Sequence, residues 1–198
     1  MRLLKVWALC VCLMTSMVTA AQQFDAAFGI GTVASTSAAS VSTSSNYFPQ
    51  DVGGGVFPGF SGDLLLKHRY GVEGEIFWRA GQNSYVGSQP FRPIFWDFNG
   101  IWAPQVQKHP GIELLAGIGE ESVRFYQPFI TCGFTCTNYT SIGHLMGDLG
   151  GGVRLYVTDH VFVRPEARLY LIHNNVEFSS GHATRLGVSI GYSFGGSQ

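Results

Sequence analysis

The sequence predicts an all-β chain that folds as a transmembrane, antiparallel, up-and-down β-barrel of about eight strands. Three observations favour this fold class. Apolar and polar residues alternate with a period of two in one run after another. The connections between these runs alternate between short and long, and the charged residues inside the runs fall on one face. With 198 residues, the chain is long enough for one such domain.

Residues 1–20 have the pattern of a cleaved signal peptide. Met1–Lys5 form a short basic region, Val6–Val18 are mostly apolar, and Val18-Thr19-Ala20 provide small residues for cleavage. The apolar run is too short for a helix that spans a membrane, so a retained anchor is the less favoured alternative. We therefore expect residues 21–198 to form a β-barrel domain outside the cytoplasm.

The rest of the chain contains eight strand-like runs separated by turn residues. The expected strands are 24–34, 53–66, 71–81, 91–102, 111–125, 143–157, 161–172 and 183–194. An even number of strands closes an antiparallel barrel with both ends on one side. Adjacent Glu120 and Glu121 interrupt the alternation, so we expect a bulge or the outer end of the fifth strand there.

Loop lengths favour a membrane barrel over a soluble one. Short connections are expected at 67–70, 103–109 and 158–160, and longer ones at 35–52, 82–90, 126–142 and 173–182. Bacterial outer-membrane barrels have short periplasmic turns and longer outer loops, and a soluble barrel has no reason to keep that alternation. The first long loop is rich in serine and threonine.

The segment Gly150–Leu171 shows which face points inward. Its aliphatic residues alternate with Arg154, Arg164, Glu166 and Arg168. An arginine facing lipid at mid-depth costs about 2–4 kcal/mol, so a membrane barrel must turn these charges into its lumen. The same face of the other strands adds Asp63 to this pattern. The predicted lumen charge network consists of Glu73, Glu75, Arg79, Asp97, Glu113, Asp148, Arg154, Arg164, Glu166, Arg168 and Arg185.

Two segments carry a family resemblance. RLYVTDHVFVRPEARLYL resembles the penultimate hairpin, and LGVSIGYSF the final assembly-signal strand, of small bacterial outer-membrane β-barrel proteins, the group that includes outer-membrane protein A-like transmembrane domains. The resemblance implies a place in the bacterial outer membrane, in contact with its lipid. It also implies recognition by the outer-membrane assembly machinery, with Tyr192 and Phe194 as the matching aromatics. The chain departs from the family where residues 195–198 follow the last aromatic, and no wall-binding domain is expected.

Charge and cysteine content narrow the other possibilities. Without Arg2 and Lys5, the 12 basic residues become 10 against 13 acidic ones, and a net charge of −3 is no footprint for nucleic acid. Cys132 and Cys136 are expected to form a small loop disulfide in an oxidising compartment. A zinc site would need more ligands than nearby His144 offers. We expect no metal and no cofactor.

The expected role is non-enzymatic and structural, and the specific function we expect is binding of an extracellular partner through the long loops. An eight-stranded barrel has room inside only for its own side chains, so we expect a plugged lumen. Three alternatives stay open: a small-solute or ion channel, a lipid hydrolase at the barrel rim, and a secreted soluble barrel that binds a ligand. For the hydrolase, lipid A deacylase-like barrels have a His-x-Ser pair, and His182-Ala183-Thr184 lacks the serine.

Overall fold

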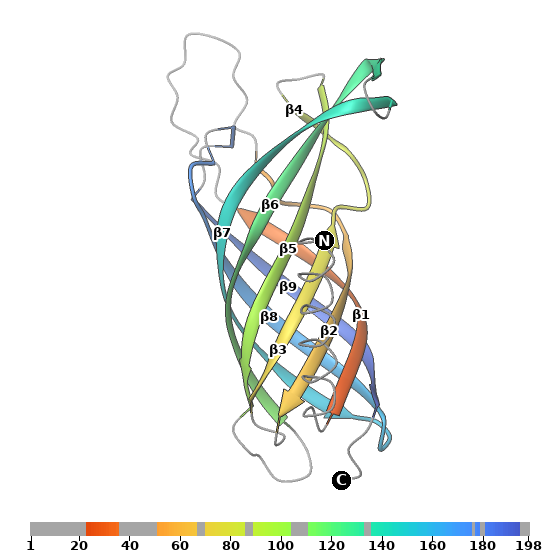
Figure 1. Ribbon diagram of the computed structural model, residues 1–198, viewed down its shortest axis with the longest axis vertical. Helices are drawn as coiled ribbons and strands as arrows, with labels where there is room; N and C mark the ends of the chain where they lie inside the picture. The colour runs from red at the N-terminus through yellow and green to blue at the C-terminus, as the bar shows by residue number, and fades with distance from the viewer. Residues whose placement is uncertain are drawn as a thin grey trace, which may run out of the picture.

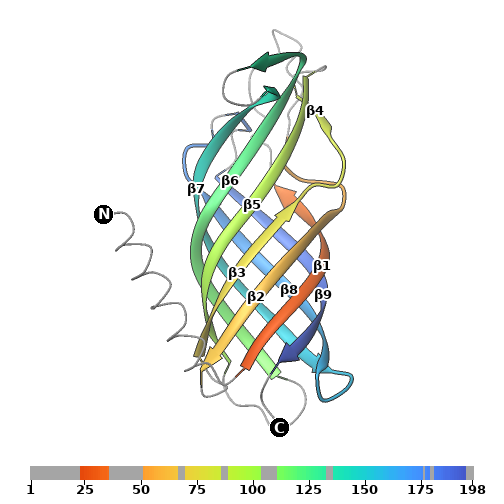
Figure 2. The same cartoon turned by 45° about the vertical axis from the view of Figure 1, so that its right-hand side comes forward.

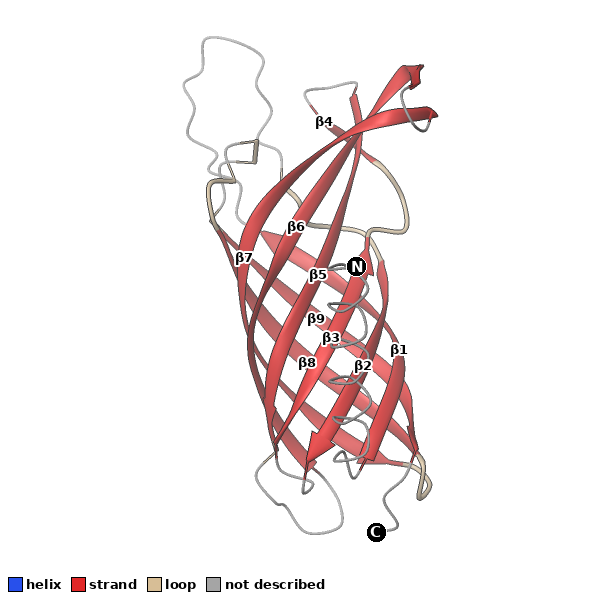
Figure 3. Ribbon diagram, in the orientation of Figure 1, coloured by secondary structure: helices blue, strands red, loops and turns tan. Residues whose placement is uncertain are grey.

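The computed structural model describes residues 23–35, 51–66, 70–85, 89–103, 111–132, 136–175, 177–178 and 181–194. Within these ranges the chain forms nine strands and turns (Figure 3), and no helix there is long and apolar enough to cross a membrane. The predicted signal peptide and most of the first long loop lie outside the described residues.

Eight of the strands close an antiparallel barrel (Figures 1 and 2). They are β1 (Gln23–Ser35), β2 (Phe57–Leu66), β3 (Tyr70–Trp78), β5 (Gln89–Trp102), β6 (Gly111–Cys132), β7 (Cys136–Tyr156), β8 (Val161–Ile172) and β9 (His182–Phe194). Sequential strands pair, and the ring closes between β1 and β9. The three-residue β4 (Asn83–Tyr85) pairs only with the start of β5, so the predicted eight-stranded barrel is confirmed.

The outer face of the barrel is an apolar belt. Phe98, Ile118 and Leu145 expose 66%, 68% and 66% of their surface, whereas Asp97 and Asp148, on alternate positions of β5 and β7, are each 1% exposed. Side chains alternate across a strand, so one face of each strand meets the surroundings and the other meets the lumen. A soluble barrel would bury its apolar face, and this arrangement instead matches contact with lipid.

The predicted loop over residues 126–142 is wrong. β6 continues to Cys132 and β7 begins at Cys136, so the two strands project as a hairpin past the outer end of the barrel (Figure 1). Cross-strand pairs hold this extension, among them Tyr126 with Tyr139, whose ring centroids lie 6.0 Å apart. The cross-strand pairing of aromatic and β-branched residues therefore extends the strands through a segment that also contains turn residues.

The irregularity expected at Glu120 and Glu121 is also wrong. Both residues keep regular register with β5 and β7, with Glu120 on the outer face and Glu121 buried. The register shift instead falls between Tyr126 and Thr131, where residues 127–130 of β6 lie opposite Asn138. Placing four residues against one makes a large, irregular bulge near the tip of the hairpin.

One strand boundary has a clear local cause. β2 begins at Phe57 rather than at 53, because Gly54 and Gly55 have φ angles of 76° and 85°, which glycine adopts at no steric cost. The Gly54 amide donates to the Val33 carbonyl oxygen over 2.7 Å. This turn brings the end of the first long connection against β1.

The barrel interior has polar and apolar layers. A small apolar cluster of Leu65, Ile101 and Leu115 lies at the end with the short turns. A larger cluster fills the outer end, where β2 and β5 begin, and contains Val33, Val52, Phe57, Phe77, Phe91, Phe95, Val123, Phe125, Met146, Tyr170, Ile172, Phe178 and Ala183. Most of the buried charged residues lie between these layers, whereas Glu121 lies at the height of the outer cluster, paired with Phe95 in the register.

Candidate functional site

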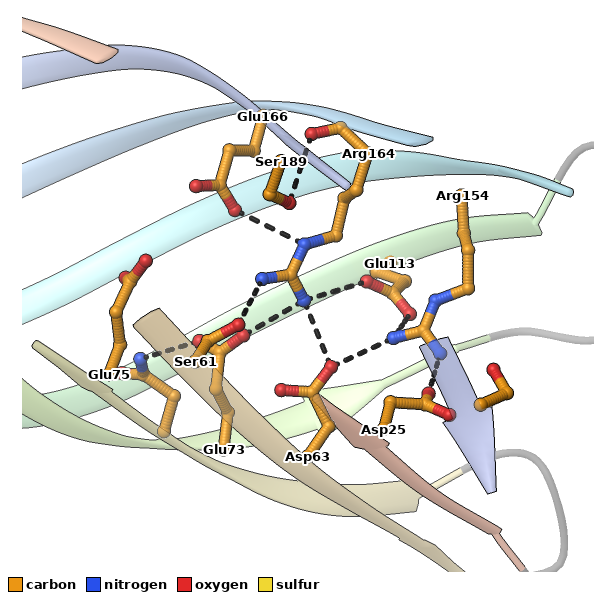
Figure 4. Close-up of polar contacts among 12 residues, drawn as sticks. Asp25, Ser61, Asp63, Glu73, Glu75, Glu113, Arg154, Arg164, Glu166 and Ser189 are labelled. Atoms are coloured by element: carbon orange, nitrogen blue, oxygen red, sulfur yellow. Dashed lines mark hydrogen bonds and ion pairs between the residues drawn. The ribbon is translucent and has the colours of Figure 1, made fainter. Parts of the chain in front are cut away.

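The lumen charges come from two walls of the barrel. The four buried arginines belong to β7, β8 and β9, and most of the buried carboxylates belong to β1, β2, β3, β5 and β6. These arginines are Arg154, Arg164, Arg168 and Arg185. Period-two alternation turns Arg164, Glu166 and Arg168 of β8 to the same side. The register between strands then sets these cations opposite carboxylates across the lumen, as Figure 4 shows for Arg154 and Arg164.

Arg164 lies at the centre of the network. Its Nη1 is 3.0 Å from a carboxylate oxygen of Asp63 and 2.9 Å from one of Glu73, and it reaches Glu113 at 3.7 Å. Its Nη2 donates to the Ser61 hydroxyl over 2.9 Å. The arginine side chain is 1% exposed, so these oxygens replace water as its hydrogen-bond partners.

Arg154 binds the inner end of the same cluster. It contacts Asp25, lies 2.9 Å from Asp63 and 2.6 Å from Glu113, and stacks over the Phe162 ring at 4.4 Å. Asp63 and Glu113 are therefore shared between Arg154 and Arg164. Such sharing makes the cluster one connected network rather than a set of separate pairs.

Arg168 contacts a group of three carboxylates that, among the described residues, could be considered for a metal ion. Glu73, Glu75 and Asp97 each offer a carboxylate oxygen, and these oxygens lie within 4.8 Å of one another. The Arg168 guanidinium is 2.6 Å from Glu73, 3.2 Å from Glu75 and 3.7 Å from Asp97. It also donates to Asp148 over 2.8 Å. The Arg168 guanidinium therefore occupies the space that an ion shared by these three carboxylates would need.

The predicted network differs from the structure in two members. Arg79 does not join the network, because it follows the last residue of β3 at the outer end of the barrel. Its guanidinium group lies there beside Gly55. Asp25 was missed, although Gln23, Asp25 and Ala27 alternate with Phe24 and Ala26 in the sequence. The signal was present but weak, because small residues occupy most lumen positions of β1. The last arginine, Arg185, contacts Glu166 and lies 2.8 Å from Glu75.

The described part of the β8–β9 connection covers the outer end of the barrel. Phe178 is 2% exposed, with its ring 5.0 Å from Phe91 and 5.5 Å from Tyr85. Asn175 donates to Glu121 over 2.9 Å, and a carboxylate oxygen of Glu177 lies 3.0 Å from His144 Nε2. The connection is therefore attached to the lumen by both packing and hydrogen bonds. His182 lies exposed at the first position of β9.

The hairpin above the barrel carries exposed apolar side chains. Cys132 and Cys136 are joined by a disulfide at its tip. Phe129 and Ile130, in the bulge just before the tip, are 61% and 69% exposed. These side chains lie beyond the lipid-facing belt, on a strand that continues directly from the barrel wall.

The final strand lies against the first. Tyr192 and Phe194 of β9 face outward, 44% and 51% exposed, and pair with Ala26 and Phe24 of β1. The Phe24 and Phe194 rings stack with centroids 5.7 Å apart. Both aromatics lie at the inner end of the barrel, where interfacial side chains meet the lipid headgroups.

Solved structures share this fold at low sequence identity. Neisserial surface protein A is 12% identical, with 87% of this chain and 96% of that chain covered and a TM-score of 0.57. Ail, the attachment invasion locus protein of Yersinia pestis, is 11% identical, with 88% and 99% covered and a TM-score of 0.57. The N-terminal β-barrel domain of Pseudomonas aeruginosa OprF is 10% identical, with 88% and 99% covered and a TM-score of 0.56.

No protein-family model matches the chain, and neither does any curated protein. At these identities the structural likeness shows the fold, which is that of small bacterial outer-membrane β-barrels. This fold agrees with the family resemblance of the two sequence segments RLYVTDHVFVRPEARLYL and LGVSIGYSF.

Proposed function

We propose that this outer-membrane barrel is a rigid, non-enzymatic scaffold that presents its β6–β7 hairpin to a partner outside the cell. The observation that carries the proposal is the pair Phe129 and Ile130, which are 61% and 69% exposed above the membrane belt. Exposed apolar side chains beside polar surroundings are typical of sites that bind another macromolecule. The disulfide at the tip keeps this surface ordered before binding, which lowers the entropic cost of association.

The filled lumen supports a scaffold more than a channel. The four arginine side chains of the network are at most 5% exposed, and a stacked aromatic layer lies above them, with the Phe77 and Phe95 ring centroids 4.8 Å apart. An eight-stranded ring has little space beyond its own side chains. Steady ion current through the protein in a planar bilayer, altered by Arg164→Gln, would contradict this reading.

The comparisons offer partial support for surface binding. Ail carries the words attachment and invasion in its name, and it was also solved in complex with the heparin analogue sucrose octasulfate. We carry over only the general idea of a barrel that binds outside the cell. We also propose that Tyr192 and Phe194 are read by the outer-membrane assembly machinery, so Phe194→Ser should lower the amount of folded protein in the membrane.

The experiment is adhesion of non-adherent bacteria that express the protein, measured on cultured host cells and on immobilised matrix proteins. The wild type should confer adhesion, and the variant Phe129→Ser with Ile130→Ser should lose it. Val56→Ser is the matched control, because Val56 is 57% exposed but lies outside the hairpin. Adhesion that is absent in the wild type, or unchanged in the double variant, would refute the proposal. Altered lipid A after overexpression would instead favour the rim hydrolase.

A further inference from the structure

We propose that Arg92 and Arg124, on the outer face of β5 and β6, together bind the phosphate of an outer-leaflet lipid headgroup. The two residues are direct partners in the β5–β6 register. Side chains at directly opposed positions of an antiparallel pair lie about 4.5–5.5 Å apart at Cβ, and two like charges there destabilise the sheet. An anion held between the two guanidinium groups removes that repulsion.

Neither arginine has an acidic partner among the described residues. Arg92 donates to the Ala80 carbonyl oxygen at 3.4 Å, and the Nε atoms of both Arg92 and Arg124 are buried without an acceptor there. Glu120, the nearest outward acid along β6, forms no ion pair with Arg124 in the described contacts. This contrasts with the lumen, where every arginine of the network contacts at least two carboxylates.

Aromatic rings hold the two guanidinium groups in place. Arg124 lies over the Tyr139 ring at 4.7 Å, and Arg92 lies 5.9 Å from the centroid of Tyr126. Cation–π contacts of this kind leave the N–H edges of a guanidinium free to donate. Paired arginines with fixed planes suit phosphate, which accepts two parallel hydrogen bonds from such a group.

The height of the pair on the barrel identifies the source of the phosphate as a lipid. On β5, Arg92 precedes outward-facing Ile94 and Trp96 and lies nearer the outer end of the barrel. On β6, Arg124 lies beyond Ile118, which is 68% exposed in the apolar belt. The pair is therefore at the outer boundary of the hydrocarbon layer, at headgroup level. Acyl chains beneath it would contact the belt while the phosphate contacts the arginines.

A hollow directly above the pair has room for the rest of a headgroup. It has a volume of about 640 Å³ and is lined by Gln89, Pro90, Tyr126, Gln127, Pro128 and Phe129. Amide and phenol groups beside aromatic faces suit a sugar ring, since they offer hydrogen bonds and an apolar surface together. The site thus fits a phosphorylated glycolipid better than a simple phospholipid.

The test is binding of lipid A to the purified, folded protein in zwitterionic detergent, followed by native mass spectrometry and titration. Diphosphorylated lipid A should bind the wild type. Arg92→Gln with Arg124→Gln should weaken that binding at least about tenfold, because the variant loses the charged hydrogen bonds to phosphate. Arg92→Lys with Arg124→Lys should keep part of the affinity. Glu120→Gln is the matched control and should bind as the wild type does.

Two further arms identify the ligand. Lipid A stripped of phosphate should bind the wild type and the glutamine variant equally weakly, and millimolar inorganic phosphate should not displace the intact lipid. Equal binding of diphosphorylated lipid A by wild type and glutamine variant would overturn the proposal, as would displacement by inorganic phosphate, which would mean a site for a free anion. The resistance of each folded variant to unfolding in gel loading buffer without boiling verifies its barrel. The inference rests on the outer-membrane location and not on the proposed adhesion, so a wild type that confers no adhesion leaves it standing.

Discussion

Removing a lumen arginine tests whether the charge network holds the barrel together. Arg168→Met should destabilise the barrel more than Arg164→Met. Asp148 lies 2.8 Å from Arg168 and has no other cationic partner in the described contacts. By contrast, the two carboxylates nearest to Arg164 each have a second arginine when Arg164 is replaced. Asp63 keeps Arg154 at 2.9 Å, and Glu73 keeps Arg168 at 2.6 Å.

The expected size follows from these contacts. Removing one partner of a buried ion pair costs about 3–5 kcal/mol, because the other charge stays buried without compensation. We expect about 5 kcal/mol for Arg168→Met and about 3 kcal/mol for Arg164→Met in the free energy of unfolding. Adding Asp148→Asn to Arg168→Met should recover part of the loss, since it removes the carboxylate that the first change strands.

The assay is urea unfolding of the folded protein in lipid vesicles, followed by tryptophan fluorescence. Arg79→Met is the matched control, because it makes the same chemical change at a half-buried arginine that follows β3 and lies outside both the lumen network and the Arg92–Arg124 pair. It should shift the free energy of unfolding by no more than about 0.5 kcal/mol. A cost of less than about 1 kcal/mol for Arg168→Met, or the reverse order of the two lumen variants, would show that these ion pairs do not hold the barrel together.

Three other outcomes follow from packing. Phe178→Ala removes a 2%-exposed ring from the outer cluster, so limited proteolysis should cut the β8–β9 connection faster while the barrel core stays protected; equal cutting rates would contradict the packing described. Cys136→Ser should speed cleavage of the β6–β7 hairpin without lowering the unfolding midpoint of the barrel, because the bond lies beyond the ring. Gly119→Ala should lower the free energy of unfolding by about 1–3 kcal/mol, because the added Cβ would clash with the backbone of β5. Gly147→Ala should leave it unchanged, because a Cβ there meets nothing within 4 Å. Urea unfolding measures both variants, and equal effects would contradict the β5–β6 register.

The sequence predicts the barrel well because period-two alternation is a local signal. Each strand of the ring was placed within a few residues at most ends, and the lumen side of Arg154, Arg164 and Arg168 follows from the cost of facing lipid. The partners of those arginines do not follow, because they depend on the stagger between strands that are distant in sequence. Asp63, for example, meets Arg164 across 101 positions of the chain.

The errors have a common physical origin. The stretch from Tyr126 to Ile142 contains Pro128, two cysteines and several threonines, a composition typical of loops, and only its pairing with the opposite strand makes it a hairpin. Arg79 continues the alternation of Glu73 and Glu75, but β3 ends at Trp78 before that alternation can act. Local pattern cannot show where a strand leaves the ring.

Strand β6 carries both proposed surface sites, the lipid-binding Arg124 and the exposed pair Phe129 and Ile130. The lumen network lies between two apolar layers and its arginines are at most 5% exposed, and we propose that binding takes place on the outer face instead. β6 carries Arg124 at the upper edge of the apolar belt and Phe129 five residues further on, in one continuous strand. A headgroup bound at Arg124 would fix the height and tilt of the strand against the membrane surface. Because the strand is paired with β7 up to the disulfide, the exposed face of Phe129 and Ile130 would inherit that orientation, and binding at the hairpin would then depend on the lipid beneath it.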